Sequence, residues 1–117
     1  MPASTHDPAR VVGLGAFTFV RDTGELRGAS ATTRLAPQPA ALLALLVDHA
    51  GEIVSRDTIK QVLWPDTAVD FEAGLHQCIR QIRVALGDDA ARPQFVETIP
   101  RRGYRLRAEA LAQPEPT

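Results

Sequence analysis

Hydrophobic and polar positions divide the chain into two parts with different spacing. In the first part, the apolar runs VVGLGAFTFV, GELRG and ATTRLA are short and are interrupted by glycines. Such runs predict a small antiparallel sheet, with turns near Gly15, at Asp22 to Gly24 and at Gly28 to Ser30. From Pro37 onward the leucines and isoleucines recur every three or four positions, which predicts helices after the strands.

The first helix is predicted to begin at Pro37 and to be closed by Gly51. Prolines at 37 and 39 suit the first helical turn, where a backbone N–H has no intrahelical partner. Glycine suits the position that ends a helix. The buried face is predicted from the i, i+3, i+4, i+7 spacing of Leu42, Leu45, Leu46 and His49.

A second, short helix is predicted over residues 56–63. Ser55 is a good N-cap, and Asp57 falls in the first turn, where the helix dipole favours a negative charge. Trp64-Pro65 is expected to end this helix. The side chains expected to be buried are Ile59, Val62 and Leu63.

The third and longest helix is predicted between Asp70, as its cap, and Gly87. Its apolar stripe consists of Leu75, Ile79, Ile82 and Leu86. These four side chains fall within about 60° of one another around a helix. The opposite face carries Gln77 and Val84, flanked by Ala73, Arg80 and Gln81.

A β-hairpin is predicted from FVETIPRRGYRL, residues 95 to 106. Gly103 is expected to take a positive φ and close the turn. Tyr104 and Leu106 should point to one side of the last strand, and the arginines at 105 and 107 to the other. Arg101 and Arg102 are therefore expected to project into solvent on a stiff arm.

Residues 10–107 are predicted to form one domain. Residues 1–9 contain two prolines and no periodicity, which suits a disordered lead-in. Residues 108–117, AEALAQPEPT, suit a tail or a linker, and are compatible with a natural end or a junction to a longer regulator. No stretch approaches about 18 uninterrupted apolar residues, so no membrane contact is expected from this segment.

Positive charge is concentrated in the C-terminal third of the chain. The formal net charge is −1, yet residues 71–107 hold seven arginines against four acidic residues. Arginine is suited to bidentate contacts with phosphates and guanine edges. Twelve of the thirteen basic residues are arginine. A GC-rich genome, which favours arginine codons over lysine codons, explains the ratio of arginine to lysine equally well. It does not explain the clustering of positive charge in residues 71–107.

The residue inventory argues against an enzyme or a metalloprotein. Cys78 is the sole cysteine, which excludes an internal disulfide and suits a reducing cytosol. The histidines 6, 49 and 76 are too scattered for a metal site. Ser55 has no histidine near it in sequence to act as a base. GLGAF lacks the third glycine of a dinucleotide loop. No catalytic residue, metal or cofactor is therefore expected.

Two helices, a longer helix and a hairpin follow one another in the order of a winged helix-turn-helix. ALLALLVDHAGEIVSRDTIKQVLW, IRQIRVALG and VETIPRRGYRL then occur in the order and spacing of a known family. Over roughly residues 16–107 the chain resembles the winged-helix output domain of OmpR/PhoB-type bacterial response regulators. The expected fold class is α+β, with an N-terminal antiparallel sheet, three helices and a C-terminal hairpin wing.

The resemblance implies sequence-specific binding of double-stranded DNA in the cytoplasm by an output domain of a two-component-related transcriptional regulator. The third helix would enter the major groove, and the wing would meet the adjacent backbone or minor groove. RNA polymerase and a second copy on tandem sites are further partners that the family suggests. The expected DNA-binding residues are Ala73, His76, Gln77, Arg80, Gln81, Arg83, Val84, Arg101, Arg102 and Arg105.

Individual roles within this set are open from sequence alone. Gln77 suits an adenine edge, and Arg80 suits either a guanine edge or a phosphate. His76 and Arg105 are compatible with phosphate contact or with plain solvent exposure. Arg83, at the edge of the face, is expected to meet a phosphate. Cys78 is expected to be a small buried hydrophobe rather than a redox sensor.

The chain also departs from the family. Ala36 stands where the family often has a capping threonine, and Pro39 where it often has glutamate, which affects only the start of the first helix. Gln81 stands where arginine is common, which leaves the base preference open. The alternative function is a winged-helix protein-interaction module, which a net charge of −1 does not exclude.

Overall fold

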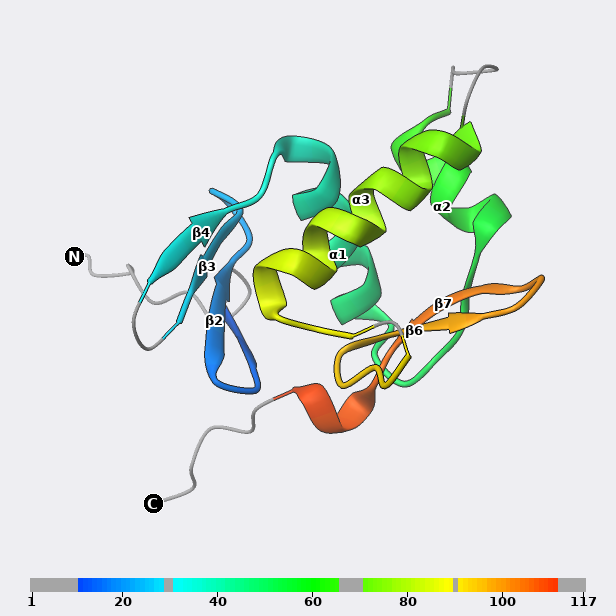
Figure 1. Ribbon diagram of the computed structural model, residues 1–117. Helices are drawn as coiled ribbons and strands as arrows, with labels where there is room; N and C mark the ends of the chain where they lie inside the picture. Colours follow the sequence, from blue (N-terminus) through cyan, green and yellow to red (C-terminus); the bar gives the residue numbers. More distant parts are fainter. Residues whose placement is uncertain (1–10, 29–30, 66–70, 90, 112–117) are drawn as a thin grey trace.

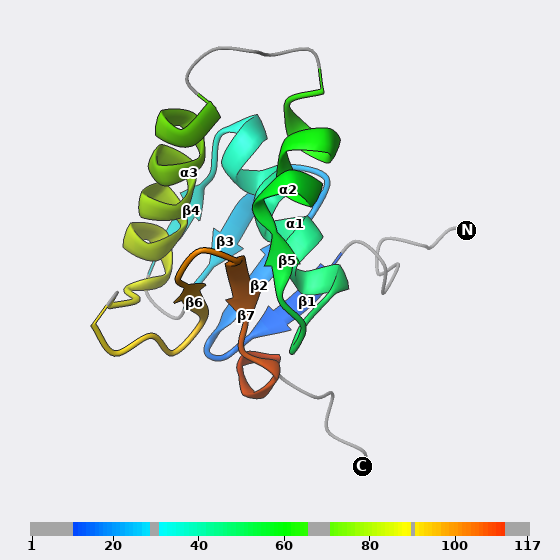
Figure 2. The same cartoon turned by 90° about the vertical axis from the view of Figure 1, so that its right-hand side faces the viewer.

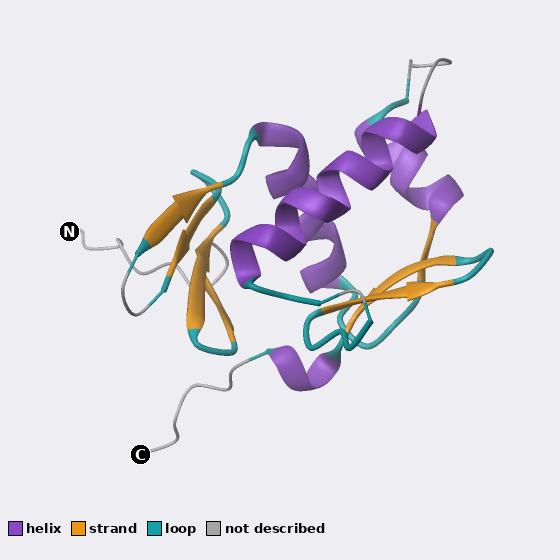
Figure 3. Ribbon diagram, viewed as in Figure 1, coloured by secondary structure: helices purple, strands orange, loops and turns teal. Residues whose placement is uncertain are grey.

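The computed structural model describes residues 11–28, 31–65, 71–89 and 91–111. The expected lead-in at 1–9, Ser30, the proposed cap Asp70 and residues 112–117 lie outside these ranges. The described chain is an α+β winged helix in which three helices lie between a four-stranded and a three-stranded sheet (Figures 1 and 3). The predicted fold class is confirmed.

The N-terminal sheet is antiparallel, and its strands follow chain order. Its strands are β1 (Val11–Leu14), β2 (Phe17–Val20), β3 (Glu25–Arg27) and β4 (Thr32–Arg34). Gly15 and Gly24 have φ of 58° and 80°, so the predicted turns fall where glycine accepts a left-handed backbone. Leu14, Phe19 and Leu26 are fully buried or nearly so and attach this sheet to the core.

Three helices form the centre of the molecule: α1 (Pro37–Asp48), α2 (Arg56–Leu63) and α3 (Phe71–Leu86). α1 packs against both other helices and the last strand. Ala36 caps α1 without a side-chain hydrogen bond, and Ser55 caps α2 by accepting from the Thr58 amide at 3.1 Å. Both cap positions agree with the sequence analysis.

The predicted buried faces of α1 and α2 need correction. α1 ends at Asp48, so His49 is the residue that follows the helix, and its side chain is 48% exposed. Leu43, which the spacing did not select, is fully buried because α1 is covered on several sides. Val62 is 56% exposed. An eight-residue helix has only about two turns, which is too few for spacing to locate the centre of its buried face.

The C-terminal sheet has the order β5-β7-β6 and is antiparallel. Its strands are β5 (Val54–Ser55), β6 (Val96–Ile99) and β7 (Gly103–Leu106). Tyr104 and Leu106 are buried while Arg105 is half-buried, which confirms the predicted alternation. The hairpin β6–β7 is the wing (Figure 1). β5 pairs with β7 and leads directly into α2 (Figure 2).

The packed chain continues beyond Arg107, where a tail or linker was expected to begin. Residues Ala108–Ala110 form a short 3-10 helix, and Ala110 is buried. The Gly15 amide donates to the Ala110 carbonyl at 2.7 Å, and Leu111 pairs with Leu14. These contacts attach the end of the described chain to the N-terminal sheet.

The connection from α3 to the wing is organised by the carboxylate of Asp88. Asp88 Oδ1 accepts from the Asp89 and Gln94 amides at 3.0 and 2.7 Å. Its Oδ2 accepts from the Phe95 and Val96 amides at 3.2 and 2.9 Å. Asp88 therefore determines where β6 begins relative to the end of α3.

We expect Asp88→Ala to lower the free energy of unfolding by about 2–3 kcal/mol, because several backbone amides lose a charged acceptor. Asp89→Ala is the matched control. Asp89 is exposed, and its carboxylate accepts from the Ala91 amide alone among the bonds described for it, so a loss below about 1 kcal/mol is expected. Urea unfolding of both variants measures the difference, and equal losses would contradict the assigned role of Asp88.

Candidate nucleic-acid interface

α3 lies along one edge of the molecule (Figure 2). Its outward side carries exposed residues, most of them polar. Its core side consists of Leu75, Cys78, Ile79, Ile82 and Leu86, so the predicted stripe is confirmed. The residues predicted to face away from the core do so, with Gln81 half-buried and the rest exposed: Ala73, His76, Gln77, Arg80, Gln81 and Val84. We call these six residues the α3 face.

Two grooves flank the α3 face. One, of about 330 Å3, runs between α3 and β4 and includes Arg34. The other, of about 460 Å3, runs between α3 and the wing and includes Thr98 and Tyr104. Arg80 and Val84 line both grooves, so they form the ridge between them. A ridge with a groove on either side is a shape that can enter the major groove of a duplex.

The two glutamines of the α3 face lie toward β4. Gln77 and Gln81 line the groove beside Arg34 and do not line the groove beside the wing. His76 lies on the other side, in the groove beside the wing. Arg34 was missed by the sequence analysis, because only the packing of β4 beside α3 brings it to this surface.

The turn at the tip of the wing differs in detail from its prediction. It closes when the Arg102 amide donates to the Ile99 carbonyl at 3.0 Å. Pro100 occupies the second position of this turn, and Arg101 occupies the third with φ of 67°. The left-handed residue that reverses the chain is therefore Arg101, which is rare for a side chain of its size.

Gly103 has the predicted positive φ, of 154°, and it has a second reason to be glycine. It begins β7 directly against β5. A Cβ atom built there would lie 2.0 Å from the Val54 carbonyl oxygen. Glycine allows the two strand backbones to meet, and the Arg56 amide donates to the Arg102 carbonyl at 3.2 Å beside this contact. The wing is thereby attached to the start of α2.

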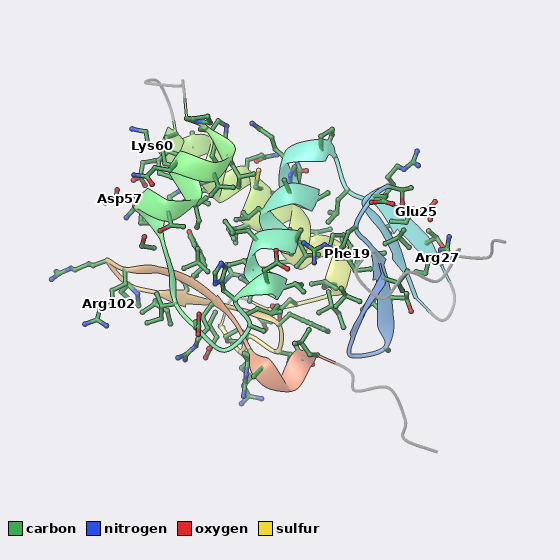
Figure 4. The ribbon with its side chains drawn as sticks, turned by 180° about the vertical axis from the view of Figure 1, so that it is seen from behind. Phe19, Glu25, Arg27, Asp57, Lys60 and Arg102 are labelled. Carbon is green, nitrogen blue, oxygen red and sulfur yellow. The ribbon has the colours of Figure 1, made fainter. Side chains whose placement is uncertain are left out.

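Arg101 and Arg102 are both exposed at the tip, as predicted. Figure 4 shows Arg102 pointing away from the body of the protein. A hollow at the tip extends to the first residues of α2 and α3, with Arg56 and Lys60 among its lining. Arg56 forms an ion pair with Glu72 there, and Lys60 Nζ lies 5.9 Å from the centre of the Phe71 ring. The tip adds two exposed cations to this mixed-charge hollow.

Arg83 and Arg105 are already engaged within the protein. Arg83 Nη2 donates to the Val96 carbonyl at 3.0 Å and to Thr98 Oγ1 at 2.9 Å, which joins α3 to β6. Arg105 Nε donates to Glu97 Oε1 at 2.8 Å. The phosphate contact expected for Arg83, and the one left open for Arg105, remain predictions. Each would have to share or replace these partners.

Other groups agree with structural roles. Cys78 is buried, and burial raises the pKa of its thiol, as expected for a small hydrophobe. Trp64 and Tyr104 are buried, and burial also raises the pKa of the Tyr104 hydroxyl, while the charges of Arg83 and Arg56 oppose that rise. Among the described residues no cluster of three potential metal ligands occurs. No described helix is long and apolar enough to cross a bilayer.

Residues 30–106 match the family model described as "Transcriptional regulatory protein, C terminal". HilA of Salmonella typhimurium, a transcriptional regulator, is 32% identical over 98 residues, which cover 80% of this chain and 17% of HilA. The transcriptional activator CadC of Escherichia coli K12 is 29% identical over 97 residues, 82% of this chain and 19% of CadC. This chain thus spans less than a fifth of the length of these two relatives.

Solved structures have the same fold. The DNA-binding domain of E. coli CadC superposes with a TM-score of 0.70 and 28% identity, covering 83% of this chain and 91% of that domain. The DNA-binding domain of Klebsiella pneumoniae RstA, solved in complex with the RstA box, superposes with a TM-score of 0.72 and 22% identity. It covers 85% of this chain and 98% of the RstA domain.

Proposed function

Because the chain belongs to the transcriptional regulatory protein C-terminal family of OmpR/PhoB-type winged helices, we propose that it binds double-stranded DNA sequence-specifically. It would act as the output domain of a bacterial transcriptional regulator rather than as an enzyme. The observation that carries the proposal is the ridge of the α3 face, with a groove on each side and the arginine-tipped wing beside it.

The proposed geometry assigns a different task to each part. The α3 face enters the major groove, where Gln77, Arg80 and Gln81 have the hydrogen-bonding groups to read base edges. Arg101 and Arg102 meet the adjacent backbone or a narrow minor groove, where the negative potential is enhanced. Contacts to phosphate would set the register of the protein on the duplex, and base contacts would provide the specificity.

We expect binding of the isolated domain to a random duplex to weaken steeply with salt. About five phosphate contacts would give a slope of log K against log salt near −4 to −5, because bound cations are released from the DNA. Fluorescence anisotropy at several salt concentrations measures this slope. A protein-interaction module would give no binding at low salt or a flat dependence, and either result would contradict the proposal.

The family also suggests the setting of this activity. We propose that the domain acts in the cytoplasm, with RNA polymerase and a second copy of the chain on tandem half-sites as further partners. Such half-sites would repeat about one helical turn apart. DNA selected from a random duplex library would show this spacing directly, together with the preferred bases.

A further inference from the structure

Val84 is the most exposed of the large hydrophobic side chains in the described part of the protein. Its exposed fraction is 74%, compared with 56% for Val62 and 38% for Ile53. It also stands on the ridge of the α3 face, one helical turn after Arg80, and borders both grooves. The apolar side chain is therefore presented at the point that would lie deepest in a DNA groove.

The fold does not explain this valine. Ile82 and Leu86, on either side of it in sequence, supply the buried contacts of this part of α3. A β-branched side chain loses rotamer freedom on a helix, and an exposed one recovers nothing by packing. A residue that has a low helix propensity and gains no packing in the fold is expected at a functional position.

We propose that Val84 contacts the C5 methyl group of a thymine in the major groove and thereby sets a preference for a T·A pair. This inference rests on the DNA binding proposed above and names a specificity determinant within it. Among the four unmodified bases, thymine alone places a methyl group on the major-groove edge. The Val84 side chain has no polar atom, so it can distinguish a base only by apolar contact, while Arg80 one turn away is free to read polar edges.

Deoxyuridine in place of thymine tests the contact, because it removes the methyl group and leaves base pairing unchanged. The best site is first selected from a random duplex library, and each thymine in it is then replaced singly. For the unaltered protein, one replacement should raise Kd about four-fold, which corresponds to one buried methyl group. For Val84→Ser, the same replacement should have no effect.

Val62→Ser is the matched control, because it makes the same chemical change at an exposed valine on α2, away from the α3 face. It should keep the full sensitivity to the missing methyl group. Circular dichroism melting checks that both variants are folded.

Three results would overturn the inference. If the unaltered protein binds its site but responds to no replacement, Val84 reads no methyl group, while the proposed DNA binding stands. If Val84→Ser remains as sensitive as the unaltered protein, another residue makes the contact. If no duplex is bound at low salt, the proposed function fails and the inference fails with it.

Discussion

Replacing Arg101 with glycine and Arg102 with alanine is expected to weaken duplex binding at least about ten-fold at moderate salt. The slope of log K against log salt should also shrink by up to about 2 units, because two phosphate-facing cations are lost. Glycine is chosen at 101 because that residue has φ of 67°, which glycine accepts without strain. The variant therefore removes charge and leaves the backbone of the turn unchanged.

The control for this variant removes two exposed arginines elsewhere. Arg27 and Arg92 are exposed and line neither the grooves beside α3 nor the hollow at the wing tip. Arg27→Ala with Arg92→Ala should lose much less affinity, because these side chains lie away from the proposed DNA contacts and Arg27 is already paired with Glu25 at 3.0 Å. A thermal melting curve should show that the tip variant is still folded. If the tip variant binds the duplex as tightly as the unaltered protein, the wing arginines do not contribute to DNA binding. That result would favour the protein-interaction alternative.

Gly103→Val is expected to lower the free energy of unfolding by more than about 4 kcal/mol, or to prevent folding. A Cβ atom at this position would lie 2.0 Å from the Val54 carbonyl oxygen, and backbone atoms of β5 cannot move aside as a flexible side chain can. The wing would separate from β5 and from the start of α2. Circular dichroism during urea unfolding measures the loss.

Gly87→Val separates this collision from simple backbone strain. Gly87 ends α3 with φ of 66°, and a Cβ atom there would meet nothing within 4 Å. The substitution should therefore lower the free energy of unfolding by only about 1–2 kcal/mol, which is the cost of placing a side chain in the left-handed conformation. If both variants lose the same stability, the close approach to Val54 is not what requires glycine at 103.

Local patterns predicted the elements that depend on neighbours in sequence. The stripe of α3 was correct because sixteen residues repeat a helical period often enough to define a face. Ser55 was correctly identified as a cap, since capping involves only residues a turn away. The alternation of Tyr104, Arg105 and Leu106 follows from strand geometry alone.

The errors occur where packing between distant segments decides. Val62 was predicted to be buried, but the orientation of α2 against α1 leaves it in solvent. The reversal of the wing was assigned to Gly103, which does have a positive φ, but the left-handed residue of the turn is Arg101. The close approach of β5 also requires glycine at 103. Packing also gives Arg83 a partner that spacing did not predict, because its guanidinium reaches the Val96 carbonyl across the space between α3 and β6. Its expected phosphate contact remains a prediction.

The sequence by itself determined the order of elements, the family, and the exposed face of the third helix, because each follows from periodicity and motifs within short stretches. Only the tertiary structure decided which arginines are paired within the protein and which project into solvent. Arg105 is paired with Glu97, whereas Arg101 and Arg102 project at the tip. It also placed Arg34 beside the α3 face. Such neighbours are set by how the sheets and helices pack, and spacing along the chain does not contain that information.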